Sequence, residues 1–360
     1  MALKFPIYPP TRYQGQNEPV KRPKEFTCFS YDKAHQYQLG DSGMKWYYPP
    51  DVGTFLGDGF DKFDKHDDGV DEHLDSLLKT IASHEQGSEE HHDFKVQKMG
   101  RENRMNGGNN KFSQLMMQYW GYKFETLSTL PRPWGETPRE YIENRNEEIV
   151  SNKEQYCSVV RTGFGKTTVC LGGEVDAIWD AKPATPGAPI NWVELKTSVE
   201  IRSQNDQFAF DRKLMKYWIQ SFLLGVPKII VGFRDRQGIL RSVQEFSTIS
   251  IPYDVQRRGM AKWDGNVCIR FTSLFIDWLR VNVNDEGVWR IKRARGADFI
   301  EVFRIEEAGH GNIITDEFMN WRIKLDLSKS KPPDPRSPAA REPTPEQQQP
   351  TSEPATASEV

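Results

Sequence analysis

Leu171-Gly-Gly-Glu174-Val-Asp176-Ala-Ile-Trp179 is followed, one predicted strand later, by Asn191-Trp-Val-Glu194-Leu-Lys196-Thr197. Both stretches are rich in apolar residues, and each is short enough to predict a β-strand. Side chains alternate between the two faces of a strand, so the two acids of the first stretch share one face, as do the glutamate and lysine of the second. If the two strands are neighbours, three carboxylates and one lysine converge on one patch.

This predicted patch favours a bound cation, because carboxylates packed side by side repel each other unless a cation or strong donors lie between them. Oxygen ligands of this kind suit Mg²⁺ or Mn²⁺, and a lysine beside them suits contact with phosphate or activation of water. An acidic strand followed by an E-x-K strand is typical of metal-dependent nucleases. The alternatives are two solvated carboxylates on an edge strand, and a local salt bridge between Glu194 and Lys196.

The surrounding pattern predicts a mixed α/β fold. A hairpin at about 157–171 would turn at Gly163 and Gly165, and a helix at about 210–224 would end at Gly225. The other predicted strands lie at about 172–179, 190–198, 228–233, 239–246, 286–293 and 298–305, and the other predicted helices at about 70–83, 113–120, 272–282 and 315–323.

Three further motifs say little on their own. Lys216 and Gln220 lie one helical turn apart and share a face, which solvent alone could explain. Gly121-Tyr-Lys-Phe-Glu125 comes right after a predicted helix. Gly163-Phe-Gly-Lys-Thr-Thr168 has features of a P-loop, but Val160 stands where that motif needs glycine, so a hairpin turn is predicted instead. The spacing of the seven histidines predicts no metal site.

Composition excludes several classes of protein. Among 360 residues, 48 Lys and Arg against 51 Asp and Glu give a net charge of −3, which excludes a generally basic nucleic-acid binder but not a local basic groove. No apolar run approaches the roughly 18 residues that span a membrane, no secretory signal is recognisable, and four widely spaced cysteines favour a reducing compartment. A mean hydropathy of −0.70 and eight prolines within 328–360 predict a disordered, Pro-rich tail there.

Taken in order, the motifs resemble the Rai/DXO family of RNA 5′-end decapping and pyrophosphohydrolase enzymes, and within it the fungal nuclear branch. The resemblance covers about 20–83 and 113–325. It rests on Gly121-Tyr-Lys-Phe-Glu125, Glu174-Val-Asp176, Glu194-Leu-Lys196, Lys216 with Gln220, and Gly232-Phe-Arg234. It implies a single large α/β domain over 1–327, with two mixed β-sheets flanked by helices and a cleft between them.

The resemblance also implies a site and a reaction. Two Mg²⁺ or Mn²⁺ ions would be held by Glu125, Glu174, Asp176, Glu194 and the carbonyl of Leu195. Lys196 would join the acids in catalysis and, with Gln220, contact the RNA 5′ phosphate, while Glu174 and Lys216 would also line the substrate site. Family reactions release pyrophosphate from 5′-triphosphate RNA and remove incompletely methylated or NAD caps, in quality control of RNA 5′ ends.

A partner and a location follow from the same resemblance. Fungal nuclear relatives bind and stabilise the nuclear 5′–3′ exoribonuclease of the Rat/Xrn type, through the region that here holds Trp134 in Leu130-Pro-Arg-Pro-Trp-Gly135. For a lone Trp, burial in the core is the usual alternative. Residence in the nucleus is also implied; Arg290-Ile-Lys-Arg-Ala-Arg295 is basic enough for an import signal but equally fits a solvated strand face.

One family motif is missing. The family carries an arginine in an R-G-x-x-T segment, with paired strands after it, where this chain has the polar stretch 84–112. Arg101 and Arg104 lie in that stretch but not in that motif, so the segment looks deleted or replaced. The main hypothesis is therefore an RNA 5′-end hydrolase of reduced activity. The alternatives are a catalytically impaired member that acts mainly as an exoribonuclease-binding partner, and a DNA nuclease of the PD-(D/E)xK class, which would leave Gly121–Glu125 unexplained.

Overall fold

The computed structural model describes residues 2–15, 18–67, 69–88, 111–261, 263–283 and 286–330. The chain divides into two compact units, residues 1–315 and 316–360, and the second contributes helix α7 (Asp316–Ser330). Most of the polar stretch, with Arg101 and Arg104, and residues 331–360 of the predicted tail lie outside the described residues. The predicted domain boundary at residue 327 therefore stays a prediction.

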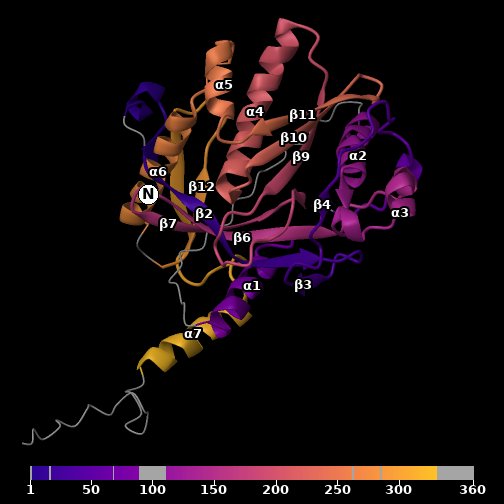
Figure 1. Cartoon of the computed structure of the whole chain (residues 1–360). Helices are drawn as coiled ribbons and strands as arrows, with labels where there is room; N and C mark the ends of the chain where they lie inside the picture. The colour runs from indigo at the N-terminus through magenta and orange to yellow at the C-terminus, as the bar shows by residue number, and fades with distance from the viewer. Residues whose placement is uncertain are drawn as a thin grey trace, which may run out of the picture. The chain divides into compact units, whose positions relative to one another are not determined.

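The strands of the described residues form three sheets (Figure 1). The six-stranded sheet has the order β11 (Leu240–Ser247), β10 (Lys228–Arg234), β9 (Trp192–Val199), β8 (Ala177–Ile178), β4 (Trp46–Tyr47) and β5 (Thr129–Leu130). The four-stranded sheet has the order β3 (Tyr37–Leu39), β2 (Val20–Tyr31), β6 (Gln155–Phe164) and β7 (Thr167–Glu174). The three-stranded sheet has the order β1 (Leu3–Pro6), β13 (Phe299–Glu306) and β12 (Val288–Lys292).

Among the sheets of the described residues, only the six-stranded one is mixed in direction, because β9 runs parallel to β10 and β4 runs parallel to β8. The helices of the first unit are α1 (Asp75–Gln86), α2 (Lys111–Leu127), α3 (Arg139–Asn144), α4 (Gln204–Leu224), α5 (Ile251–Arg258) and α6 (Gly265–Asn282). Short 3₁₀ helices are η1 (Pro10–Tyr13), η2 (Phe60–Lys62), η3 (Trp134–Glu136) and η4 (Arg145–Glu147). The prediction of a mixed α/β fold is confirmed, with a third sheet that the sequence did not predict.

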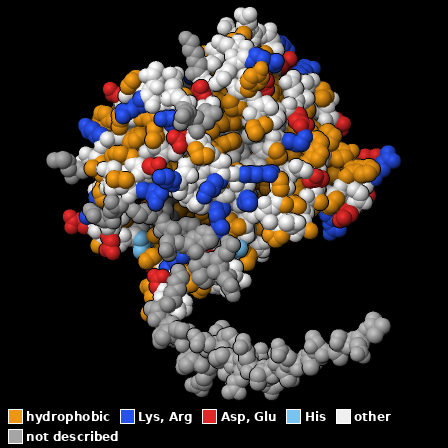
Figure 2. Space-filling model, turned by 60° about the vertical axis from the view of Figure 1, so that its left-hand side comes forward, with side chains coloured by type: hydrophobic (Ala, Val, Ile, Leu, Met, Phe, Trp, Pro, Cys, Tyr) orange, Lys and Arg blue, Asp and Glu red, His pale blue; other side chains and the backbone are white. Residues whose placement is uncertain are grey.

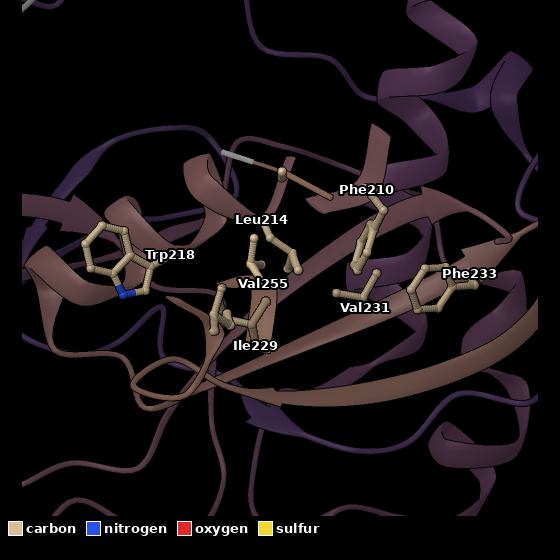
Figure 3. Close-up of a cluster of buried hydrophobic side chains, with 9 residues drawn as sticks. Phe210, Leu214, Trp218, Ile229, Val231, Phe233 and Val255 are labelled. Atoms are coloured by element: carbon tan, nitrogen blue, oxygen red, sulfur yellow. The ribbon is translucent and has the colours of Figure 1, made fainter. Parts of the chain in front are cut away.

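The parallel pair β9–β10 is covered on both faces by helices, as parallel strands generally are. Alternate residues of β10 pack against α4 and α5 in one cluster: Phe210, Leu214, Trp218, Ile229, Val231, Phe233, Ile251, Val255 and Ala261 (Figure 3). A second cluster packs α2 against these strands and their neighbours: Leu56, Phe124, Leu127, Ala177, Val193, Leu195, Ile230 and Leu240. The two helices that matter for the site, α2 and α4, are thus both fixed to the same strands.

The glycine at position 232 of β10 has a packing role. A Cβ atom there would lie 2.4 Å from Cε2 of Phe124, a fully buried residue of α2. Gly232 therefore lets the Phe124 ring lie directly on the strand and brings α2 close to the sheet. The motif that includes Gly232 thus supports the helix that carries Glu125.

The predicted strand 172–179 is wrong as a single element. β7 ends at Glu174 in the four-stranded sheet, and β8 begins at Ala177 in the six-stranded sheet. Gly173 lets the chain pass close to α4 at this point, because a Cβ there would lie 2.7 Å from Cδ1 of Leu224. The alternation of side chains could not reveal that the chain changes sheet.

Gly121–Glu125 does not follow a helix but lies inside α2, which continues to Leu127. A glycine inside a helix costs about 1 kcal/mol relative to alanine, which favours a helix end in sequence reasoning. In the folded chain the burial of neighbours such as Phe124 and Leu127 offsets that cost. The prediction of a helix end near Trp120 is therefore wrong.

The hairpin and the long helix are confirmed with small changes of boundary. β6 and β7 are joined by Gly165-Lys166, with Gly165 at φ +54°, so the P-loop interpretation is excluded. α4 ends before Gly225 at φ +76°, as expected, but begins at Gln204. Ser203 caps it, because its side chain accepts a hydrogen bond from the backbone N–H of Asp206.

Charged side chains are unevenly distributed on the surface. Figure 2 shows one face on which lysine and arginine side chains gather near the middle, among apolar and uncharged groups. A local concentration of positive charge is thus compatible with the net charge of −3. None of the described helices is long and apolar enough to cross a membrane.

Candidate active site

Glu174 and Asp176 lie where the chain passes from one sheet to another. Glu174 is the last residue of β7 and is opposite Cys157 of β6 in the four-stranded sheet. Ala177, which follows Asp176 directly, pairs with Val193 of β9 in the six-stranded sheet. The two acids therefore stand at a junction of sheets and not on one face of one strand.

β9 brings Glu194 and Lys196 to this junction, next to Asp176. The Oδ2 atom of Asp176 accepts a hydrogen bond of 2.6 Å from the backbone N–H of Leu195. In an extended strand the N–H and C=O of one residue point to the same side. The carbonyl of Leu195 therefore points to the side of Asp176, where it is available as an additional oxygen ligand.

Glu194 is fully buried, and only one of its two carboxylate oxygens has a partner in the described part of the chain. Its Oε1 atom accepts a hydrogen bond of 2.8 Å from Nε2 of Gln220 and pairs with the ammonium of Lys196. Its Oε2 atom is buried and has no partner among the described residues. A buried carboxylate oxygen without a donor is costly, and a hard cation among these oxygens would remove that cost, so the donor set fits Mg²⁺ or Mn²⁺.

The carboxyl groups resist ionisation in the metal-free protein. Burial, and next the negative charge of Asp176, raise the pKa of Glu194 to about 8. The same two causes raise the pKa of Glu174 to about 7, although solvent still reaches its side chain. Burial also raises the pKa of Asp176, against the opposing effects of Lys196 and the N–H of Leu195. Such a crowded set gains most from a divalent cation.

Lys196 is a fixed positive charge in this cluster. Burial alone would lower the pKa of Lys196, but the charges of Asp176 and Glu194 outweigh it and raise the pKa above the usual range. An ammonium held in this way stays protonated at neutral pH. Of the two predicted roles, the structure therefore favours phosphate contact over activation of water.

Glu125 joins the cluster from α2. It is half-buried, and burial raises its pKa well above the usual value, followed by repulsion from Asp176 and Glu174. Its position is set by the packing of Phe124 next to it and by Lys123, whose Nζ donates a hydrogen bond of 2.5 Å to the carbonyl of Asn146 in η4. All four predicted acids and Lys196 are thus brought into one electrostatic cluster.

Comparison with known proteins agrees with this geometry. The family described as "RAI1 like PD-(D/E)XK nuclease" matches residues 21–99 and 89–319, which is most of the chain. The chain belongs to this family. A decapping nuclease RAI1 of Chaetomium globosum is 65% identical over 344 residues, covering 92% of each chain, and one of Neurospora crassa is 53% identical over 375 residues, covering 92% of this chain and 90% of the relative.

Solved structures of RAI1 family members share the fold. That of Candida albicans Rai1 in complex with pU5-Mn²⁺ has a TM-score of 0.81 at 29% identity and covers 90% of this chain and all of that one. That of Scheffersomyces stipitis Rai1 with (3′-NADP)⁺ and a calcium ion has a TM-score of 0.77 at 25% identity and covers 86% of this chain and 98% of that one. The predicted family is confirmed, and so is the prediction of a nuclease, which is a hydrolase.

Of the predicted pair on α4, only Gln220 reaches the acids. Lys216 is exposed one turn before it and makes no hydrogen bond or ion pair with the described part of the chain, so its role at the substrate site stays a prediction. One further residue, Lys45, which precedes β4, was not predicted. Its charge acts on Glu174 and Asp176, and it pairs with Glu154 at 3.2 Å. No local sequence signal marks it.

Proposed function

We propose that this chain is a divalent-metal-dependent decapping nuclease that acts on RNA 5′ ends. The observation that carries the proposal is the cluster of four carboxylates, in which Glu194 is fully buried and one of its oxygens lacks a partner among the described residues. The names of the curated relatives and the manganese and pU5 bound to the Candida albicans structure support it. The PD-(D/E)xK alternative belongs to the same class of nuclease, but the named relatives give no support to DNA as the substrate.

The proposed role of each site residue follows from its position. Glu125, Glu174, Asp176, Glu194 and the carbonyl of Leu195 would hold two Mg²⁺ or Mn²⁺ ions, which supply Lewis-acid activation of water and charge stabilisation at phosphorus. Lys196, fixed as a cation by Asp176 and Glu194, would hold the 5′ phosphate, and Gln220 would orient Glu194 and share that contact. The resemblance extends the proposal to pyrophosphate release from 5′-triphosphate RNA, to incompletely methylated and NAD caps, and to action in the nucleus.

The assay for this proposal is pyrophosphate release from 5′-triphosphate RNA with Mn²⁺. We expect Asp176→Ala and Glu194→Ala to abolish it, because each removes a proposed ligand. The melting temperature of the metal-free variants should hold or rise, because removing one carboxylate from the crowded cluster relieves repulsion. Glu245→Ala, which changes an exposed carboxylate of β11, is the matched control and should keep full activity. Full manganese-dependent activity in Glu194→Ala would show that the site is assigned wrongly.

We further propose that the chain binds a nuclear 5′–3′ exoribonuclease through Trp134. The core alternative for this residue is wrong, because its side chain is 67% exposed. The segment that presents it is held in place: Leu130 before it is buried in β5, and Oγ1 of Thr137 after it donates hydrogen bonds to the carbonyls of Arg132 and Pro133. A rigidly presented, exposed indole fits the anchor of an interface.

Trp134→Ala should reduce exoribonuclease binding roughly 30-fold, since truncation of an aromatic anchor commonly costs about 2 kcal/mol. The melting temperature and pyrophosphate release should not change, because the side chain is exposed and belongs to η3, outside the acid cluster. A pull-down with a thermal melt measures both. Unchanged binding would place the interface elsewhere. Trp179→Ala, which changes another exposed Trp, serves as the control.

A further inference from the structure

A second group of metal-ligating side chains lies outside the acid cluster. Each of three residues offers one ligand atom, and these atoms all lie within 4.8 Å of one another: His35, His66 and Glu72. His35 lies in the turn between β2 and β3, and the other two lie between η2 and α1. We propose that His35, His66 and Glu72 form a binding site for one divalent transition-metal ion, with zinc as the best fit.

The first argument is the hydrogen bonding of His35. Its Nδ1 atom is 2.7 Å from the carbonyl oxygen of Lys153, and a carbonyl can only accept, so Nδ1 carries the proton. In the neutral ring Nε2 then carries a lone pair and can only accept. That lone pair faces Oε1 of Glu72 at 2.9 Å, a contact between two acceptors. It is stable only if a second proton or a cation lies there. A ring whose other nitrogen donates to a backbone carbonyl is also the usual form of a metal ligand.

The second argument is the charge balance of the cluster. Nε2 of His66 approaches the same oxygen of Glu72 at 3.4 Å, and the two imidazole rings stack with centroids 3.7 Å apart. If both rings were protonated, two positive charges would be stacked against one carboxylate. One divalent cation would satisfy all three ligand atoms with both rings neutral, once the His66 ring turns out of the stack so that the lone pairs of both rings point at one position.

The third argument is preorganisation. The His35 side chain is 8% exposed and stacks on Tyr31 with centroids 4.2 Å apart, and its backbone is held at φ +59°, which is uncommon for a residue other than glycine. The backbone N–H of His66 donates a hydrogen bond of 2.7 Å to the side chain of Asn152. The His35 ring is thus positioned by contacts outside the proposed site, and the backbone that carries His66 is fixed by Asn152.

Two of the three separations between ligand atoms are close to those around zinc, and the third, between the two imidazole nitrogens, lies within 4.8 Å. Zn–N and Zn–O bonds of about 2.0–2.2 Å in a tetrahedron place ligand atoms roughly 3.3–3.5 Å apart, within a few tenths of an ångström of the separations of 2.9 and 3.4 Å. Two imidazoles and one carboxylate suit zinc better than magnesium, which prefers oxygen ligands alone. The Glu72 side chain is 41% exposed, so the fourth position would be open to water.

Zinc binding to the full chain tests the proposal, with excess Mg²⁺ present to occupy the carboxylate cluster. After treatment with EDTA and dialysis, bound zinc is measured in wild type, His66→Ala, Glu72→Gln and His73→Ala. The last is the control, because it removes a neighbouring histidine that is outside the proposed set. We expect wild type and His73→Ala to bind one more equivalent of zinc than His66→Ala, and Glu72→Gln to bind that equivalent at least tenfold more weakly.

X-ray absorption at the zinc edge gives a second readout. The wild type should show imidazole ligation, and His66→Ala should lose it. Equal zinc content in wild type and His66→Ala, or ligation by oxygen alone, would overturn the proposal and leave a protonated His35 paired with Glu72. If His66→Ala fails to fold, Glu72→Gln decides, because its side chain is partly exposed and its substitution is isosteric.

Discussion

Glu194 illustrates how a single residue can be placed for function against its own preference. Its carboxylate is fully buried, and one of its oxygens lacks a donor among the described residues. Lys196 and Gln220 satisfy only the other oxygen. The metal-free protein therefore keeps an unfavourable group that a bound cation would make favourable, so metal binding and stability should be linked.

This linkage gives the stability of the metal-free protein a defined pH dependence. Burial raises the pKa of Glu194 to about 8 from its ordinary value of 4.5, and that of Glu174 to about 7. Between pH 4.5 and 8 the folded protein thus binds more protons than the unfolded chain, so the free energy of unfolding falls as pH rises. We expect the melting temperature in EDTA to decrease across this range.

Manganese should reverse the trend, because metal binds the ionised carboxylates. It should raise the melting temperature more at pH 8 than at pH 6, and Glu194→Gln should flatten the pH dependence without metal. A melting temperature of the metal-free wild type that rises from pH 5 to pH 8 would contradict the raised pKa values of these acids. Thermal melts at several pH values measure both effects.

At the scale of elements, local rules predicted what local forces decide. The hairpin β6–β7 was predicted because Gly165 permits the tight turn, and the end of α4 because Gly225 takes a left-handed conformation. The same rules failed at Glu174–Asp176 and at Gly121. Sheet membership, and the burial of Phe124 against Gly232, depend on residues far away in the sequence.

Two glycine substitutions should separate packing from helix propensity. Gly232→Ala should destabilise the protein by about 1–3 kcal/mol, because its Cβ would lie 2.4 Å from the Phe124 ring. Gly121→Ala in α2 meets nothing within 4 Å and should stabilise by about 0.5–1 kcal/mol. Denaturant unfolding measures both. An unchanged stability in Gly232→Ala would mean that α2 is not held by this contact.

For the whole molecule, the acid and E-x-K stretches correctly predicted that Glu174, Asp176, Glu194 and Lys196 come together, although Glu174 and Asp176 do so at a junction of two sheets and not on one strand face. The alternation of side chains in β9 brings Glu194 and Lys196 together as expected. Glu125 and Gln220 entered the predicted site only through the family resemblance, because nothing in their own neighbourhood marks them. No sequence pattern predicts the grouping of His35, His66 and Glu72, because it joins a turn to a distant segment.

The absence of an R-G-x-x-T motif from the sequence also concerns the whole molecule. The alignment with the Neurospora crassa relative extends over 375 positions, more than the 360 residues of this chain, so that relative carries residues without a counterpart here. The two family matches, 21–99 and 89–319, meet within the polar stretch. We infer that the absent segment lies there and that the grip on the RNA 5′ phosphate is weakened.

Replacing residues 89–110 with the corresponding R-G-x-x-T segment of a relative should therefore raise activity. An arginine on a phosphate contributes about 1.5–3 kcal/mol, or one to two decades in binding. The expected change is a lower KM for 5′-triphosphate RNA, measured beside a replacement in which the arginine is alanine. If the unmodified chain is already as active as its relatives, Arg101 or Arg104 takes this role and the inference is wrong.

The passage of the chain between two sheets at Glu174-Val175-Asp176 has a mechanical consequence. Each acid is anchored to a different hydrogen-bonded network, and Gly173 is in close contact with Leu224 of α4, the helix whose Gln220 holds Glu194. The spacing of the carboxylates therefore depends on how the two sheets pack against each other. Substitutions in the hydrophobic core that shift one sheet against the other should therefore change the affinity for metal, although every ligand residue stays the same.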